Sequence, residues 1–208
     1  MVSHEHYMKM QRDSVKQKLG TLWSSSKNYS LRKDEINNTE YYWPDIDRFS
    51  FPHQIETVKP VVTEVNSFVK RKRTVLQAGG NCGIYTREYA QHYENVYTFE
   101  PDATNMNCLV LNTNDCNNII KFQACLGESQ GMTAIQNPLE IMDIGGIHVK
   151  TIEKMPENLM VVESKPNIPI LKIDDIKFTE LDLIHLDIEG YEFYALKGGI
   201  ETIKKFKP

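Results

Sequence analysis

The sequence predicts an α/β fold with a parallel, Rossmann-like sheet, on three observations. Short apolar runs with the length of buried strands occupy residues 74–78, 96–99 and 119–124. Segments with a helical pattern, at residues 83–93 and 103–112, separate these runs. A glycine-rich turn follows the first run. Strands that alternate with helices indicate a parallel sheet with right-handed crossovers.

This alternation is interrupted between residues 127 and 170. Glycine, proline and asparagine punctuate short apolar pieces there, which predicts an inserted hairpin or loop excursion. A fourth buried strand is predicted at residues 183–187, with a helix over 191–196. Upstream, apolar residues at spacings of three and four predict an amphipathic helix over 55–70, in which Pro60 marks a kink or the true start.

The length of 208 residues suits one globular domain with an appended segment. We predict an N-terminal extension at residues 1–55 and a cofactor-binding domain at residues 56–208. Within the extension, a helix is expected near residues 5–20. The aromatic stretch at residues 40–45 either forms a lid over a substrate or packs on the domain body.

Composition and charge argue against several classes of protein. The net charge of −4 gives no general attraction to nucleic acid or to an anionic membrane, so we expect neither as a partner. The basic run at residues 70–73 is interpreted as a solvated helix end, with a polyanion contact as the alternative. No apolar stretch approaches the roughly 18–20 residues that span a bilayer. The four cysteines form no C-x-x-C pair, which argues against a disulfide framework or zinc site and favours a reduced, cytoplasmic protein.

The glycine-rich turn carries the first chemical signal, in the run Gly79-Gly80-Asn81-Cys82-Gly83. Glycine lets the backbone turn sharply and approach a ligand, and the helix that follows presents free N–H groups to an anion. Glu100 stands at the end of the next strand, 21 residues after Gly79. An acid at that position can accept hydrogen bonds from both ribose hydroxyls of a nucleoside cofactor.

Two nucleoside cofactors use this geometry, NAD and S-adenosylmethionine (SAM). The dinucleotide pattern needs a glycine at position 78, where this chain has Ala78. The spacing Gly79-x-Asn81-x-Gly83 fits a SAM-binding loop better. We therefore predict that SAM is the cofactor.

Five segments resemble the FkbM family of SAM-dependent methyltransferases. Val75-Leu76-Gln77-Ala78-Gly79-Gly80-Asn81-Cys82-Gly83-Ile84-Tyr85-Thr86 resembles V-I-D-x-G-A-N-x-G-x-Y-T, and Phe99-Glu100-Pro101 resembles F-E-P. Ala124-Cys125-Leu126-Gly127 is similar to the segment after the third strand, and residues 171–176 resemble T-L-D-D-L. Residues 186–198 resemble I-D-V-E-G-x-E-x-x-V-L-K-G, the most specific of the set. The resemblance covers about residues 75–207.

The resemblance implies a class I methyltransferase fold and methyl transfer from SAM, usually to a hydroxyl group on a sugar or natural product. It implies that the turn contributes the cofactor-binding residues Gly79, Gly80, Asn81, Cys82 and Gly83. Thr86 would lie beside the methionine pocket, Glu100 would hold the ribose, and Cys125 belongs to the segment beside the adenine. Asp187 and Glu189 would lie at the tip of the fourth strand facing the methyl group, with Asp187 also contacting the cofactor.

Two departures from the family pattern affect these expectations. Gln77 replaces an acid that helps to receive the cofactor's ammonium group. Its amide oxygen can still accept that bond, and we expect weaker binding because a charge-assisted bond is about twice as strong. The sequence also ends at residue 208, where the family continues into a further apolar strand. We expect a sheet truncated after its fourth parallel strand, whose open edge is covered by the N-terminal segment or by the second subunit of a homodimer.

Asp187 is the first candidate for the base that a hydroxyl acceptor needs, and Glu189 is the second. Glu189 could equally be a structural acid that faces the next helix. His185, on the same strand, is interpreted as a core residue. Asp187 and Glu189 could together bind magnesium, but no third ligand stands at a suitable spacing, so no metal is predicted.

We therefore expect a SAM-dependent O-methyltransferase acting on a small-molecule or glycan acceptor. The alternative is a degenerate relative that binds a nucleoside ligand, or nothing, and serves a structural or interaction role; Gln77 favours it. A nucleotide-dependent oxidoreductase is a third possibility, which Ala78 and the Asp187-Ile188-Glu189-Gly190 motif argue against.

Overall fold

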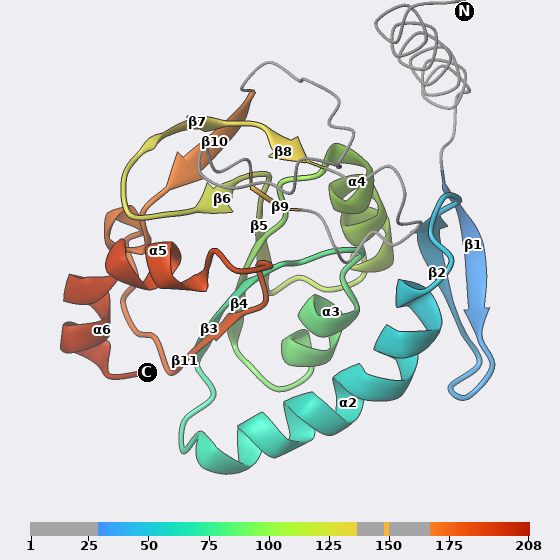
Figure 1. Ribbon diagram of the computed structural model, residues 1–208. Coiled ribbons are helices and arrows are strands. Elements are labelled where there is room, and N and C mark those ends of the chain that lie inside the picture. Colours follow the sequence, from blue (N-terminus) through green and yellow to red (C-terminus); the bar gives the residue numbers. More distant parts are fainter. Residues whose placement is uncertain (1–28, 137–147, 150–166) are drawn as a thin grey trace, which may run out of the picture.

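A computed structural model describes residues 29–136, 148–149 and 167–208, and its centre is a parallel four-stranded sheet (Figure 1). The strand order is β11-β3-β4-β5, and every neighbouring pair is parallel. The four strands are β3 (Thr74–Ala78), β4 (Asn95–Phe99), β5 (Ile119–Phe122) and β11 (Leu183–Leu186). The predicted α/β fold with a parallel sheet is confirmed.

The strand register brings the carboxyl ends of these strands to one edge of the sheet. Ala78 is paired with Phe99 on one side and with Leu186 on the other. The residues that follow these strand ends are Gly79, Glu100 and Asp187. Three of the predicted site residues therefore meet at neighbouring positions, as the rule for ligand sites in open α/β sheets requires.

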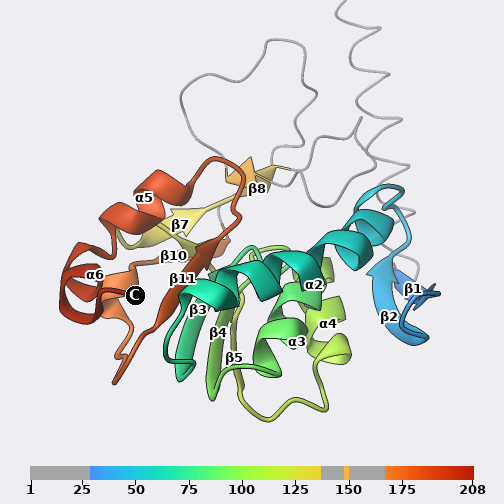
Figure 2. The same cartoon turned by 90° about the horizontal axis from the view of Figure 1, so that it is seen from below.

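Helices cover both faces of the sheet (Figure 2). One face packs against α2 (Ser50–Phe68), α3 (Ile84–Ala90) and α4 (Ala103–Asn112). The other packs against α5 (Glu192–Lys197) and α6 (Ile200–Phe206). Since side chains alternate along a strand, Val75 belongs to the first hydrophobic cluster and Leu76 to the second. Both are fully buried.

Helix α2 begins at Ser50, earlier than predicted, and runs through Pro60 to Phe68. The carboxylate of Asp47 accepts hydrogen bonds from the backbone N–H of Ser50 (3.1 Å) and of Phe51 (3.1 Å). These bonds satisfy N–H groups that a helix start leaves without partners. Pro60 is exposed and does not mark the helix start.

A hairpin precedes α2, formed by β1 (Tyr29–Asp34) and β2 (Thr39–Pro44) as an antiparallel pair. Trp43 is fully buried and its ring meets Phe51 edge-on, with 5.0 Å between centroids. The backbone of Tyr42 is hydrogen-bonded to the Asn112 side chain at the end of α4. The aromatic stretch at residues 40–45 therefore packs on the domain body.

The excursion between residues 127 and 170 contains several short strands. Strand β6 (Cys125–Leu126) comes just before it. The strands that follow are β7 (Gly131–Thr133), β8 (Ile135–Gln136), β9 (His148–Val149) and β10 (Ile168–Leu171). β8 and β9 form an antiparallel pair, while β10 pairs in parallel with β6 and antiparallel with β7. The third strand predicted at residues 119–124 is present as β5, but it ends at Phe122, and the chain then joins this second sheet.

Within the described residues β11 has β3 as its one strand neighbour, so it lies at the edge of the sheet as predicted. A short 3-10 helix, η2 (Ile173–Asp175), follows β10. No helix in the described parts of the chain is long and apolar enough to cross a membrane. The helix predicted near residues 5–20 lies outside the described residues.

Candidate functional site

The glycine turn between β3 and α3 is closed by backbone hydrogen bonds. The N–H groups of Gly79 and Gly80 both donate to the Phe99 carbonyl, at 3.1 and 2.9 Å. The Gly83 N–H donates to the Gly80 carbonyl at 2.8 Å. Gly79 and Gly83 have φ angles of +84° and +90°, which side chains with a Cβ rarely adopt. The turn is therefore tied to the end of β4 and shaped by two left-handed glycines.

Two of these glycines also leave no space for a methyl group. A Cβ on Gly79 would lie 1.9 Å from the Asp187 carbonyl oxygen. A Cβ on Gly80 would lie 2.7 Å from Leu109 Cδ1 and 2.8 Å from Thr98 Oγ1. The turn thus passes in van der Waals contact between the tip of β11 and the side chains of β4 and α4.

Glu100 joins the end of β4 to this turn. Its Oε2 accepts a hydrogen bond from the Asn81 N–H at 2.7 Å, and its Oε1 accepts one from the Asp102 N–H at 2.8 Å. The side chain is almost fully buried, and burial raises the pKa of its carboxyl group to about 8. Asp102 in turn accepts hydrogen bonds from the N–H groups of Thr104 and Asn105 at the start of α4.

Gln77 lies below the turn in a closed network of buried polar groups. Its Oε1 accepts hydrogen bonds from Thr98 Oγ1 (2.7 Å) and Thr86 Oγ1 (3.1 Å). Its Nε2 donates to the Gly79 carbonyl at 2.8 Å. All three side chains are fully buried. The amide oxygen therefore has two hydroxyl donors already, and the amide nitrogen supplies a bond that a carboxylate cannot make.

The tip of β11 has a different character. The Asp187 N–H donates to the Ala78 carbonyl at 3.0 Å, while the side chains of Asp187 and Glu189 are exposed. Glu189 has a φ angle of +54° and Gly190 one of +89°. Glu192 Oε1 accepts hydrogen bonds from Ile188 N–H (2.9 Å) and Gly190 N–H (3.2 Å), which hold the turn.

This arrangement agrees with a comparison of the chain with known families. The model of the methyltransferase FkbM domain matches residues 77–208, well over half of the chain. The chain belongs to the FkbM methyltransferase family. Methyltransferases of this family are SAM-dependent. No curated protein sequence matches the chain.

A comparison with solved structures finds partial similarity to several methyltransferases. TYW2 from M. jannaschii, in complex with AdoMet, is 18% identical over 47% of this chain and 44% of its own, with a TM-score of 0.37. Trm5b from Pyrococcus abyssi is 15% identical over 47% and 28%, with a TM-score of 0.36. A SAM-dependent methyltransferase from Agrobacterium tumefaciens is 16% identical over 48% and 33%, with a TM-score of 0.33. The chain spans less than half of the length of these structures.

Cys125 of the FkbM domain lies close enough to Glu100 to be influenced by its charge. It is buried on β6, and burial, followed by the charge of Glu100, raises the pKa of its thiol to about 12. The next turn also packs tightly, since a Cβ on Gly127 would lie 2.7 Å from Ile170 Cγ2 and 3.5 Å from Tyr191 Cε1. Cys125 is therefore a small, buried and uncharged side chain near Glu100.

His185 occupies the strand before the β11 tip. Its Nδ1 is hydrogen-bonded to the Tyr89 hydroxyl at 2.8 Å, and Tyr85 meets its ring edge-on at 4.9 Å between centroids. Burial lowers the pKa of His185, although the nearby Asp187 opposes that shift. Burial therefore favours the neutral form of the ring, which packs against two tyrosines of α3.

Sequence patterns did not single out Asn112 or Asp47, which the structure brings to the glycine turn and to the start of α2. Asn112 Nδ2 donates to the Cys82 carbonyl at 2.7 Å. Asp47 stands three residues before Ser50, a spacing that could have signalled the helix start. Over the described parts of the chain, no group of three or more His, Cys, Asp or Glu side chains is placed to hold a metal ion.

Proposed function

We propose that this FkbM domain transfers the methyl group of SAM to a hydroxyl group on a sugar or natural product. The observation that carries the proposal is the 2.7 Å contact between the Asn81 N–H and Glu100 Oε2. It joins a glycine turn and a buried acid at the carboxyl ends of adjacent parallel strands, where a nucleoside cofactor is expected.

The residues present fit SAM. Glu100 would accept hydrogen bonds from the ribose hydroxyls, and it already accepts bonds from two backbone N–H groups of the same site. The turn from Gly79 to Gly83, with Thr86 behind it, would shape the methionine pocket, and Cys125 would lie on the adenine side. Gln77 would give only a weak contact to the cofactor's ammonium group, because its oxygen already accepts two hydroxyl bonds. When bound, SAM supplies an electrophilic methyl group on a sulfonium centre.

Asp187 is the proposed general base. Its backbone is fixed against Ala78, while its carboxylate is exposed where an acceptor can approach. In this role it would take the proton from the acceptor hydroxyl as the oxygen attacks. Glu189 is the second candidate for the same role, since it is exposed two residues further along the same turn.

The test is a methyl-transfer assay with methyl-labelled SAM and a panel of sugars and natural-product alcohols. Replacing Asp187 with Asn should lower turnover by about 10²–10⁴-fold, because general-base catalysis contributes factors of that size. The affinity for S-adenosylhomocysteine (SAH), measured by calorimetry, should change by no more than a few-fold. Glu189→Gln tests the second candidate and should leave turnover near that of the wild type if Asp187 is the base. Full turnover by Asp187→Asn would exclude Asp187 as the base.

A second candidate is a non-catalytic module that binds a nucleoside ligand. Gln77 favours it, because the family's acid is replaced by an amide whose oxygen is engaged by Thr86 and Thr98. SAH binding without methyl transfer to any acceptor in the panel would support this module. Binding of NAD instead of SAH would overturn the proposed methyl transfer.

A further inference from the structure

One buried amide connects the glycine turn to the N-terminal hairpin. Asn112, the last residue of α4, is 7% exposed. Its Nδ2 donates to two carbonyls, those of Cys82 (2.7 Å) and Tyr42 (2.9 Å). Its Oδ1 accepts from the Tyr42 N–H at 2.7 Å. The side chain thus pairs with both backbone groups of Tyr42 in β2 and holds a carbonyl of the glycine turn.

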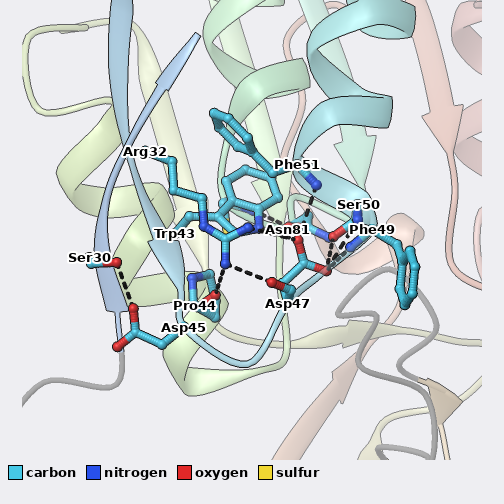
Figure 3. Close-up of polar contacts among 11 residues, drawn as sticks. Ser30, Arg32, Trp43, Pro44, Asp45, Asp47, Phe49, Ser50, Phe51 and Asn81 are labelled. Carbon is cyan, nitrogen blue, oxygen red and sulfur yellow. Dashed lines mark hydrogen bonds and ion pairs between the residues drawn. The ribbon is translucent and has the colours of Figure 1, made fainter.

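The hairpin also reaches the turn through the hydrophobic core. The Cys82 side chain is fully buried in the same cluster as Trp43 and Phe51. Trp43 Nε1 donates to Asp47 Oδ2 at 2.7 Å, and its ring packs edge-on against Phe51, so two contacts fix the indole. Figure 3 shows Asn81 of the glycine turn within the same group of polar residues as Asp47.

The base of the hairpin is itself rigidly held. The guanidinium of Arg32 donates to the carbonyls of Pro44 (2.9 Å) and Asp47 (2.7 Å), as Figure 3 shows. Arg32 also forms an ion pair with the Asp47 carboxylate at 3.6 Å, and that carboxylate is fully buried. Residues 29–47 lie before the stretch that the FkbM family model matches. They therefore form a support for the turn that the matched domain does not include.

We infer that Asn112 is a positioning residue, through which the β1–β2 hairpin holds the glycine turn in its cofactor-binding conformation. The inference rests on the proposed SAM site. The turn benefits from such support because Asn81 has a left-handed φ of +46°, which costs some energy even for asparagine, the side chain that tolerates it best after glycine. Asn81 Oδ1 accepts from the Cys82 N–H at 2.6 Å, and Asn112 fixes the Cys82 carbonyl on the other side of that residue.

The test compares Asn112→Asp with Asn118→Asp in the full chain. Asn118 is a matched control, because its Nδ2 also donates to two backbone carbonyls, those of Ala90 (2.9 Å) and Tyr93 (2.8 Å), away from the turn. Both variants lose two such bonds and gain a charge. In Asn112→Asp, calorimetry should show that SAH binds at least about tenfold more weakly than in the wild type. The reason is that the variant loses the hydrogen bond to the Cys82 carbonyl that holds the turn. Asn118→Asp should stay within about twofold of wild type.

A second readout separates positioning from simple loss of stability. Coupling between two sites is reciprocal, so SAH should slow amide hydrogen exchange in residues 39–44 of the wild type. That protection should persist in Asn118→Asp and disappear in Asn112→Asp. If Asn112→Asp does not fold, Asn112→Ser replaces it, since serine retains one donor and adds no charge.

The outcomes distinguish this inference from the proposed function. A wild type that does not bind SAH contradicts the proposed function itself. A wild type that binds SAH, with equal affinity and equal protection of residues 39–44 in Asn112→Asp or Asn112→Ser, overturns the positioning role alone.

Discussion

Two turns meet at the carboxyl edge of the sheet, and they differ in how they are built. The turn after β3 is packed against its surroundings, and the acid beside it, Glu100, is almost fully buried. The turn after β11 carries Asp187 and Glu189, whose side chains are exposed. The geometry of the first turn is fixed before binding, which suits the cofactor, a ligand of constant structure. The second suits an acceptor that must enter and leave.

The two turns differ most clearly at their glycines, Gly79 and Gly190, and substitutions there should have the largest effect on the free energy of unfolding. Gly79 and Gly190 have nearly equal φ angles, +84° and +89°. A Cβ on Gly79 would lie 1.9 Å from a backbone oxygen, whereas a Cβ on Gly190 would meet nothing within 4 Å. Gly79→Ala should therefore lower the free energy of unfolding by more than about 3 kcal/mol or prevent folding. Gly190→Ala should lower the free energy of unfolding by only about 1–2 kcal/mol, the cost of placing an alanine at a left-handed φ angle.

Urea denaturation followed by circular dichroism measures both variants. Equal destabilisation of the two would contradict the idea that close packing, and not φ alone, distinguishes the turn after β3. A folded Gly79→Ala variant that binds SAH normally would contradict it as well.

Two carboxyl groups extend the comparison to pH. Burial raises the pKa of Glu100 to about 8, above its ordinary 4.5. The folded state then holds a proton that the unfolded state has lost, so the stability falls as pH rises from about 4.5 to about 8, by at most about 1.4 kcal/mol per pH unit. At Glu192 burial also raises the pKa, but backbone hydrogen bonds from Ile188 and Gly190 outweigh it and the pKa is lowered. Its stabilising effect is present above pH 4.5 and is lost as the pH falls.

Glu100→Gln should therefore remove the decline in stability between pH 4.5 and 8, and Glu192→Gln should reduce stability only above the acid range. The difference in unfolding free energy between each variant and the wild type, measured from pH 4 to 8.5, gives both effects directly. Glu100→Gln should also weaken SAH binding by up to about tenfold at pH 7, as expected for one lost hydrogen bond between uncharged groups. A Glu100→Gln curve parallel to the wild type would show that folding does not raise the pKa of Glu100.

Much of this arrangement was predictable from local patterns. The strands β3, β4 and β11 are short apolar runs between turn residues, and parallel strands bring their carboxyl ends together. The contact between Glu100 and the glycine turn follows from that topology. The sequence did not reveal the end of β5 at Phe122, because β6 is defined by pairing with β10, whose Ile170 lies opposite Cys125. Such distant pairings leave no local periodicity.

The polar interior was less predictable for the same reason. Gln77 was identified as a departure from the family, but its partners Thr86 and Thr98 lie 9 and 21 residues away on other elements. Asn112 reaches Tyr42 across 70 residues. A side-chain amide has no periodic signature, and only the assembled fold shows which backbone groups it satisfies.

The smallest expected effect concerns the link between the two turns. Tyr89, on the helix after the glycine turn, is hydrogen-bonded to His185, two residues before Asp187. Tyr89→Phe should cost about 1 kcal/mol of unfolding free energy. Tyr93→Phe is the matched control, because the Tyr93 hydroxyl donates to Asn66 Oδ1 at 2.9 Å and the ring is similarly buried.

Of the two variants, only Tyr89→Phe should change the pKa of His185. Burial lowers the pKa of His185, and loss of the hydrogen bond with Tyr89 should shift that pKa. A rise toward the ordinary value would show that the hydroxyl donates to Nδ1, because such a bond favours the neutral ring. A titration of the histidine signals by NMR measures this shift. If the pKa of His185 is the same in both variants, Tyr89 serves packing alone, and the turn after β11 is electrostatically independent of the helix that leaves the glycine turn.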